Sequence, residues 1–185
     1  MTESAGERGS GSRAGARAPS STTRGLVAGL HRKPEVPSEH GLPKPSVPEA
    51  QIRRSGLEGD FNRYRHEEKR DDEGMAVLLM PRETIEELNR EGWPVRPGDL
   101  GENVVSSGIA YNAFAPGRRV AVGEALLEIS KPCTPCDNLY LLPYVGLERG
   151  PAFLKTMVDR RGWYARVINE GTVRVGDPIE LLVSP

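Results

Sequence analysis

The hydrophobic and polar positions of this chain predict short strands joined by turns, with few helices. Residues 75–80 form a continuous apolar run with the length of one buried strand, and residues 26–30 and 163–168 have the apolar content of two more. Residues 81–90 begin with proline, carry acidic side chains in the first turn and place two apolar side chains three positions apart. This last pattern predicts a helix with one buried face.

One short pattern, a valine followed by two residues, a glycine and an acid, occurs three times, at residues 95–99, 120–124 and 173–177. Glycine provides the turn conformation, and the acid accepts hydrogen bonds from nearby backbone amides. The second and third copies are followed by apolar patterns of strand length. We therefore interpret the copies as tight corners between the strands of a mainly β protein, a barrel that carries two or three short helices.

Other segments have little apolar sequence. The first 23 residues contain no Val, Leu, Ile, Phe, Trp or Tyr, so residues 1–24 are predicted to be a disordered Ser/Gly/Ala/Arg-rich tail before one domain at residues 25–185. Residues 62–73 are almost entirely charged or polar and are predicted to be a solvated loop. A short helix is predicted over residues 153–158, after Pro151.

Composition narrows the classes of function. A length of 185 residues is typical of a single domain with a real core. Lys+Arg 25 against Asp+Glu 26 gives no basic surface for nucleic acid, and no apolar run is long enough to span a membrane. The chain has 2 cysteines, too few for a disulfide-stapled secreted fold, and no apolar signal segment. We therefore expect a cytoplasmic protein that binds neither nucleic acid nor membrane.

The two cysteines, Cys133 and Cys136, give the most specific chemical signal because only two residues separate them. The spacing is compatible with half of a zinc site completed by His31, His40 or His66, and with a thioredoxin-like redox pair. It is also compatible with two small structural residues. A fourth interpretation is a single functional thiolate that binds a soft metal or carries sulfur.

Two further segments carry polar side chains suited to ligand binding. Residues 159–166 place three arginines around a glycine and two aromatic residues at the start of a strand, and arginine binds phosphates and carboxylates through paired hydrogen bonds. Strand alternation puts Tyr164 and Arg166 on one face. Residues 98–103 are rich in glycine and polar side chains, a weak signal for a ligand-binding loop. A solvated strand surface explains the arginines equally well, so these segments alone do not decide.

Taken in order along the chain, these motifs resemble the MOSC domain, the C-terminal domain of molybdenum-cofactor sulfurases. The matching segments are residues 41–45, 56–60, 98–103, 135–139, 161–167 and 171–177. The resemblance covers roughly residues 25–183, and several motifs in one order are more specific than any of them alone. One departure is at His66. Many standalone relatives carry His-Gly-Gly, whereas His66 is followed here by Glu-Glu-Lys-Arg.

The resemblance implies a closed, mostly antiparallel β-barrel and a site for molybdenum cofactor or activated sulfur. The family's characteristic cysteine corresponds to Cys136, which would ligate molybdenum or carry a persulfide. Cys133 would be spare, or would resolve an oxidised or persulfidated Cys136 through a disulfide. The cofactor-binding candidates are Lys44, Arg161 and Arg166 for the pterin phosphate, together with Asp60, Glu102 and Asn103.

Three functions follow from the resemblance. A molybdenum-cofactor oxidoreductase would reduce N-hydroxylated or N-oxide small molecules, with electrons from a separate reductase because the sequence has no iron–sulfur motif. A sulfur carrier or sulfurtransferase would pass persulfide sulfur from Cys136 to an acceptor, and its desulfurase, with pyridoxal phosphate, would be a separate partner. A cofactor-binding module would have no turnover. The sequence leaves these alternatives open, and with them whether the protein is an enzyme.

Overall fold

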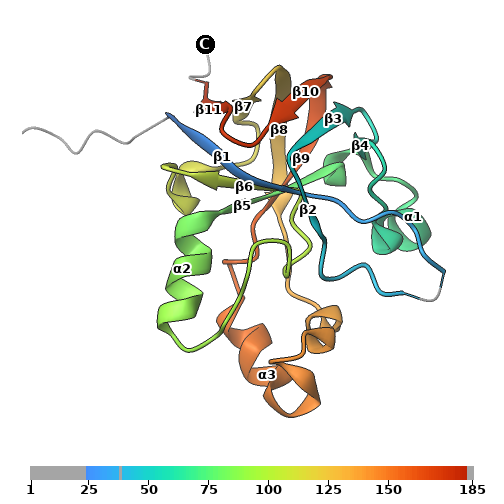
Figure 1. Ribbon diagram of the computed structural model, residues 1–185, viewed down its shortest axis with the longest axis vertical. Helices are drawn as coiled ribbons and strands as arrows, with labels where there is room; N and C mark the ends of the chain where they lie inside the picture. The colour runs from blue at the N-terminus through green and yellow to red at the C-terminus, as the bar shows by residue number, and fades with distance from the viewer. Residues whose placement is uncertain (1–23, 38, 183–185) are drawn as a thin grey trace, which may run out of the picture.

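Seven strands close into a barrel (Figure 1). The computed structural model describes residues 24–37 and 39–182, so the predicted tail at residues 1–23 lies outside the described residues. Around the barrel the order is β1 (Arg24–His31), β6 (Val104–Ser107), β5 (Val77–Pro81), β9 (Trp163–Asn169), β8 (Ala125–Pro132), β7 (Arg119–Val122) and β11 (Pro178–Leu181). β11 pairs with β1 and completes the circle. Only β5 and β6 are parallel, which confirms the prediction of a closed, mostly antiparallel barrel.

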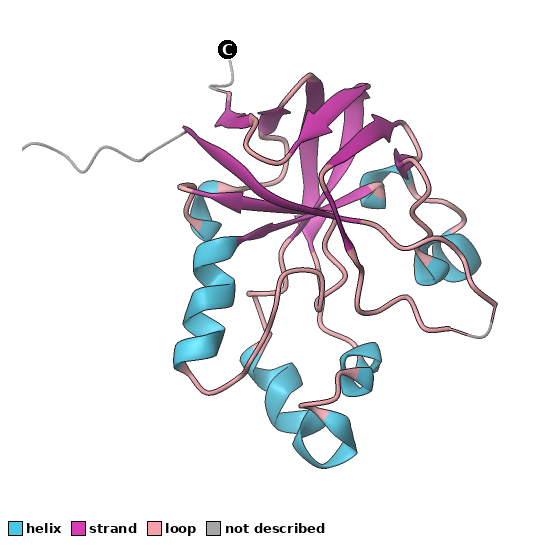
Figure 2. Ribbon diagram, in the orientation of Figure 1, coloured by secondary structure: helices cyan, strands magenta, loops and turns pink. Residues whose placement is uncertain are grey.

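A smaller sheet and several helices surround the barrel (Figure 2). β2 (Ser46–Val47) pairs antiparallel with the end of β1. The second sheet consists of β10 (Gly171–Arg174), β3 (Glu49–Arg53) and β4 (Gly56–Leu57). The α-helices are α1 (Arg63–Lys69), α2 (Arg82–Arg90) and α3 (Gly146–Thr156). Three short 3-10 helices are η1 (Glu73–Met75), η2 (Tyr111–Ala113) and η3 (Asp137–Leu141). In Figure 1, α2 and α3 lie below the barrel and α1 lies to its right.

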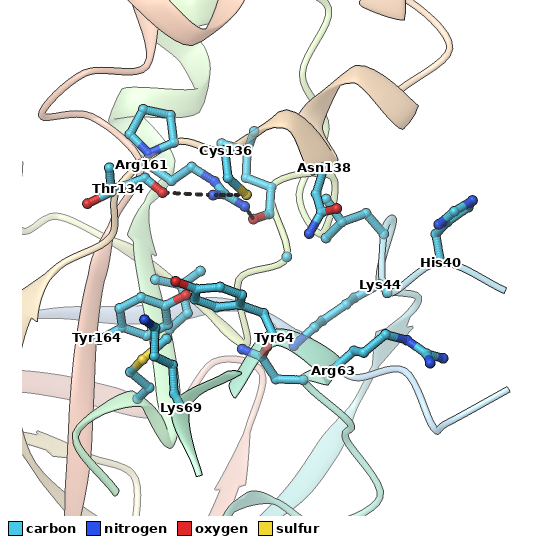
Figure 3. Close-up of a pocket in the computed structure, with 18 of the residues that line it drawn as sticks. His40, Lys44, Arg63, Tyr64, Lys69, Thr134, Cys136, Asn138, Arg161 and Tyr164 are labelled. Atoms are coloured by element: carbon cyan, nitrogen blue, oxygen red, sulfur yellow. Dashed lines mark hydrogen bonds between the residues drawn. The ribbon is translucent and has the colours of Figure 1, made fainter. Parts of the chain in front are cut away.

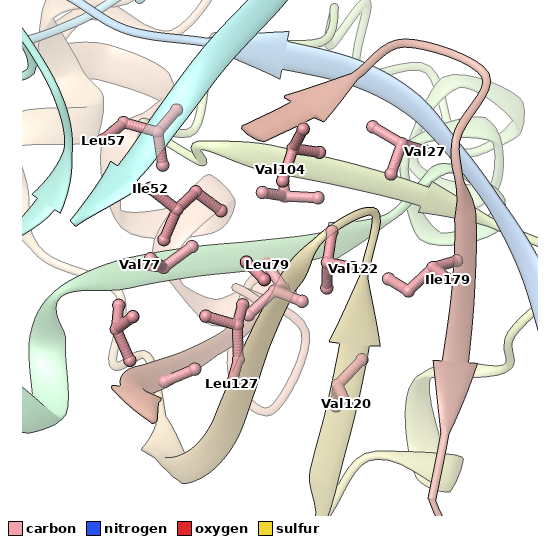
Figure 4. Close-up of a cluster of buried hydrophobic side chains, with 14 of the residues drawn as sticks. Val27, Ile52, Leu57, Val77, Leu79, Val104, Val120, Val122, Leu127 and Ile179 are labelled. Atoms are coloured by element: carbon pink, nitrogen blue, oxygen red, sulfur yellow. The ribbon is translucent and has the colours of Figure 1, made fainter. Parts of the chain in front are cut away.

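Two hydrophobic clusters form the core. The larger fills the barrel, where alternate side chains of each strand point inward, among them Val77 and Leu79 (Figure 4). The second cluster lies outside the barrel, against α2 and α3, and includes Met80 and Phe153. β5 contributes to both clusters and is buried on both faces. This double burial explains why its sequence is a continuous apolar run rather than an alternating one.

The charged segment at residues 62–73 is not the solvated loop that its composition predicts, because it contains α1. The Asn62 side chain caps the helix by accepting from the Arg65 amide at 3.1 Å. Arg65 is buried and donates to the carbonyls of Ser55, Asp71 and Asp72 at 2.5, 3.1 and 2.8 Å. These side-chain-to-backbone bonds fold a segment that has almost no apolar side chains of its own.

α3 begins earlier than predicted and runs through Pro151. Proline normally interrupts a helix because it lacks a backbone donor and clashes with the preceding turn. Here packing maintains the helix, since Phe153 is fully buried and Gly150 lies against the ring of Tyr140. The remaining prediction for this region, a helix after the proline, is confirmed only as the second half of α3.

The repeated valine–glycine–acid pattern forms corners in which the acid accepts a backbone hydrogen bond. Asp177 accepts from the Arg174 amide at 2.7 Å, and Asp99 accepts from the Arg96 amide at 2.9 Å. The copy at residues 120–124 joins β7 to β8, and the copy at 173–177 joins β10 to β11. The copy at 95–99 lies between α2 and β6 instead, so the prediction that it joins two strands was wrong.

No helix within residues 24–37 and 39–182 is long and apolar enough to cross a membrane.

Gly162, at the start of β9, should tolerate no side chain. Its φ is +94°, and a Cβ there would lie 2.4 Å from the Leu79 carbonyl oxygen. Gly92 has a similar φ of +90° but open space around it, which makes it the matched control. We expect Gly92→Ala to lower the free energy of unfolding by about 1 kcal/mol, and Gly162→Ala to cost roughly 1–3 kcal/mol more. Urea denaturation measures both, and equal losses would contradict the close approach of β9 to β5.

Candidate functional site

A cavity of about 450 Å³ opens below the barrel, beside the end of β8 (Figure 3). Its walls are residues 40–44, α1 with the residues just before it, the end of β8 with the loop that follows, and the start of β9. The volume is within the usual range for a small-molecule or cofactor site. The cavity therefore brings together segments that are far apart in the sequence.

The charged side chains that line this pocket are all basic. They are Lys44, Arg63, Lys69, Lys131 and Arg161, and no Asp or Glu of the described residues 24–37 and 39–182 lines the pocket. This is a local concentration of positive charge in a protein whose formal net charge is -1. A concave surface lined by one sign of charge attracts ligands of the opposite sign. The pocket is therefore suited to an anionic ligand.

Arg161 and Cys136 form the polar floor of the pocket. Arg161 is 6% exposed, and its Nη1 donates to the Thr134 carbonyl at 3.1 Å and to Cys136 Sγ at 3.5 Å. Its Nη2 donates to the Leu100 carbonyl at 3.2 Å. Burial opposes the charge of Arg161, but the sulfurs of Cys133 and Cys136 favour it, and its pKa is raised.

Cys136 is half-buried and faces the cavity, whereas Cys133 is buried behind it. Cys133 is 3% exposed, does not line the pocket and has its sulfur near the Thr134 carbonyl. Burial raises the pKa of Cys133, and it also raises the pKa of the adjacent Tyr164 phenol, which lines the pocket. The two cysteines are free thiols in clearly different environments.

Lys44, one of the cofactor-binding candidates, lines the pocket, and Asp60 and Asn103 hold it from behind. Lys44 Nζ lies 2.6 Å from Asp60 Oδ2, and the two side chains are only 5% and 8% exposed. The Asn103 amide donates to the same Asp60 oxygen at 2.8 Å, and the Lys33 amide donates to the other at 2.8 Å. The structure therefore brings these three candidates together, with Lys44 alone facing the cavity.

Glu102 and Arg166 lie away from the pocket. Glu102 is fully buried, and its Oε1 accepts from the Gly98 amide at 2.6 Å. Arg166 is on the outside of the barrel and lies 3.6 Å from Glu128. It shares a face with Tyr164, as alternation predicts, but two residues along a strand separate their positions by about 7 Å. Only Tyr164 is at the end of β9 that borders the pocket.

Sequence reasoning missed the contribution of α1 to this site. Arg63, Tyr64 and Lys69 all line the pocket, and they belong to the segment interpreted as a solvated loop. The available signal was weak, since a lysine and a tyrosine among many charged residues are also typical of an exposed surface. His66, on the same helix, faces Asp71 outside the pocket at 3.1 Å.

The zinc interpretation finds no support in this part of the chain. Within residues 24–37 and 39–182, no three His, Cys, Asp or Glu side chains are grouped closely enough to hold a metal ion. The cysteine spacing therefore does not come from a zinc cluster made by the described residues.

Fold and site together define a β-barrel domain with a thiol-containing ligand pocket lined by cations. The family model of the MOSC domain matches residues 64–180, and the chain belongs to this family. The family is associated in general with binding of molybdenum cofactor. A comparison with curated proteins gave no match.

Several solved structures share the fold. YuaD from Bacillus subtilis is 19% identical with a TM-score of 0.71, over 88% of this chain and 97% of that one. A structure described as a hypothetical protein is 25% identical with a TM-score of 0.67, over 88% and 70%. YiiM from Escherichia coli is 23% identical with a TM-score of 0.60, over 86% and 71%.

The buried Glu102 carboxyl should make stability fall as pH rises. Burial raises the pKa of Glu102 above its ordinary value of 4.5, so the folded protein binds this proton more tightly than the unfolded chain does. The stabilisation is therefore complete below about pH 4.5 and is lost as pH rises through the folded-state pKa. Glu102→Gln keeps an acceptor for the Gly98 amide and carries no charge. We expect the stability advantage of the variant over the native protein to grow as pH rises above about 4.5.

Urea denaturation across this pH range tests the expectation. Glu86→Gln, which removes an exposed carboxyl on α2, is the matched control. Stability curves of the native protein and of Glu102→Gln that stay parallel across the range would contradict the role of burial.

Proposed function

We propose that this protein binds molybdenum cofactor in the pocket, with the Cys136 thiolate as the protein ligand of the metal. The observation that carries the proposal is the half-buried Cys136 sulfur, which faces a pocket lined only by basic charged groups and accepts a hydrogen bond from the buried Arg161. A cation beside a thiol favours the thiolate, which is the form that ligates metals. Membership of the MOSC family supports the same assignment.

The chemistry of the donor groups fits this cofactor. A thiolate is a soft ligand suited to a metal that also takes sulfur donors, and a single protein ligand suffices when the rest of the ligands come with the cofactor. We assign the negatively charged pterin phosphate to Lys44 and Arg161, which line the pocket. Arg166 is no longer a candidate for this role because it lies on the outside of the barrel, where it pairs with Glu128. When bound, the cofactor would supply two-electron redox chemistry.

As an oxidoreductase, the protein would remove oxygen from an N-hydroxylated or N-oxide small molecule. For an N-hydroxylated substrate, two electrons and two protons yield the amine and water, and the electrons come from a separate reductase. The chain's own contribution is to bind and orient the substrate against Cys136 and to keep proton donors beside it. The raised pKa of Tyr164 keeps its phenol protonated through the neutral range, so it remains a hydrogen-bond donor at the pocket wall.

A sulfur carrier is the second candidate function, because an accessible thiolate beside a cation also suits a persulfide at Cys136. In that case the sulfur comes from a separate desulfurase that uses pyridoxal phosphate. The buried Cys133, with its raised pKa, is poorly suited to resolve the persulfide. We place either activity in the cytoplasm, where two unpaired thiols stay reduced.

Metal content tests the proposal. The full-length protein is purified from a host that makes molybdenum cofactor, and molybdenum and pterin are measured for the native protein, Cys136→Ser and Cys133→Ser. We expect nearly stoichiometric metal in the native protein, at least about a tenfold loss in Cys136→Ser, and no loss in the Cys133→Ser control. A native protein without molybdenum but with an added sulfur atom on Cys136 would instead support the sulfur carrier.

A further inference from the structure

Of the five cations that line the pocket, Lys69 is the one that contacts neither a carboxylate nor a cysteine sulfur in residues 24–37 and 39–182. The others are balanced from outside the cavity or at its floor. Lys44 pairs with Asp60, Lys131 with Asp72 at 2.7 Å, and Arg63 with Glu67 at 3.3 Å, while Arg161 contacts the Cys136 sulfur. Lys69 remains free to neutralise a charge that a ligand brings.

Lys69 is placed next to a second hydrogen-bond donor on the same helix. Its Nζ lies 5.1 Å from the centre of the Tyr64 ring, and Tyr64 is 47% exposed. Hydrogen bonding to Tyr64 raises the pKa of Lys69, so the amine is charged at neutral pH. In Figure 3, Tyr64 and Lys69 lie beside Tyr164, on the side of the cavity across from Cys136 and Arg161.

We propose that Lys69 and Tyr64 form an oxyanion-binding subsite that recognises a carboxylate or phosphate group of the substrate. The Lys69 ammonium can donate a charge-assisted hydrogen bond to such a group, and the Tyr64 hydroxyl can donate a neutral one. The reacting part of the ligand would lie at Cys136 and its acidic part at α1. The assignment to the substrate rests on the proposed function, whereas the oxyanion subsite itself does not.

The proposed function assigns the cofactor's own phosphate to Lys44, which also pairs with Asp60, and to Arg161, which also contacts Cys136. This leaves Lys69 for a second anionic group. The substrate class is therefore an acidic small molecule with a reducible nitrogen, rather than a neutral or basic one.

Binding of inorganic phosphate to the metal-free, full-length protein tests the subsite. Phosphate is titrated by calorimetry or by NMR shifts at low salt, because salt screens such contacts. Lys69→Gln should weaken binding roughly tenfold, and Lys69→Arg should retain it, since a charge-assisted hydrogen bond is lost only in the first. Lys155→Gln, an exposed lysine on α3 outside the pocket, should bind as the native protein does. Unchanged binding in Lys69→Gln, or an equal loss in Lys155→Gln, would overturn the subsite.

The cofactor content of the protein purified with its cofactor distinguishes whether the subsite binds an oxyanion of the substrate or the phosphate of the cofactor. If Lys69→Gln retains the native content of molybdenum and pterin while it loses phosphate binding, the subsite serves the substrate, as proposed. If cofactor content falls together with phosphate binding, the subsite holds the cofactor's phosphate, and the acidic substrate is rejected. A native protein that binds phosphate but contains no molybdenum would contradict the proposed function and leave the subsite intact.

Discussion

The buried guanidinium of Arg161 is the constraint on which the rest of the site depends. It connects three segments, because it donates to carbonyls of the loop before β6 and of the loop after β8 while its own backbone begins β9. Gly162 follows it at a point where only glycine lets β9 approach β5. The position of the pocket floor is therefore fixed by the closure of the barrel, and Cys136 is held against a charge that cannot move away.

A buried charge is costly unless it is paired and hydrogen-bonded. Two carbonyls and the Cys136 sulfur accept hydrogen bonds from the Arg161 guanidinium, and the sulfurs of Cys133 and Cys136 favour the charge that burial opposes. Lys44 follows a different principle, since Asp60 and Asn103 fix it as a member of a neutralised pair. The site thus has one cation that contacts a cysteine sulfur at the floor and one that is paired with a carboxylate at the wall.

The barrel was predictable from the sequence because it depends on local patterns. Double burial makes β5 a continuous apolar run, and in the motifs at residues 95–99 and 173–177 the acid accepts from a backbone amide of the same corner. α1 was not predictable, since Arg65 folds it through carbonyls outside the helix and leaves no apolar periodicity. For Arg166, strand alternation correctly predicted that it shares a face of β9 with Tyr164. Alternation does not predict how far along β9 a residue lies from the pocket, and only Tyr164 lines it. Glu102 and Asn103 accept hydrogen bonds from the backbone amides of Gly98 and Leu78, and neither side chain lines the cavity. They therefore support the backbone around the site instead of binding a ligand directly.

The asymmetry of the cysteine pair also bears on the chemistry. The Cys133 amide donates to the Gly162 carbonyl at 2.9 Å, so its backbone continues the β8–β9 pairing and directs its sulfur into the protein. A resolving cysteine must attack as a thiolate, and burial raises the pKa of Cys133 away from that form. Chemistry at Cys136 alone therefore suits this arrangement better than chemistry that needs both sulfurs.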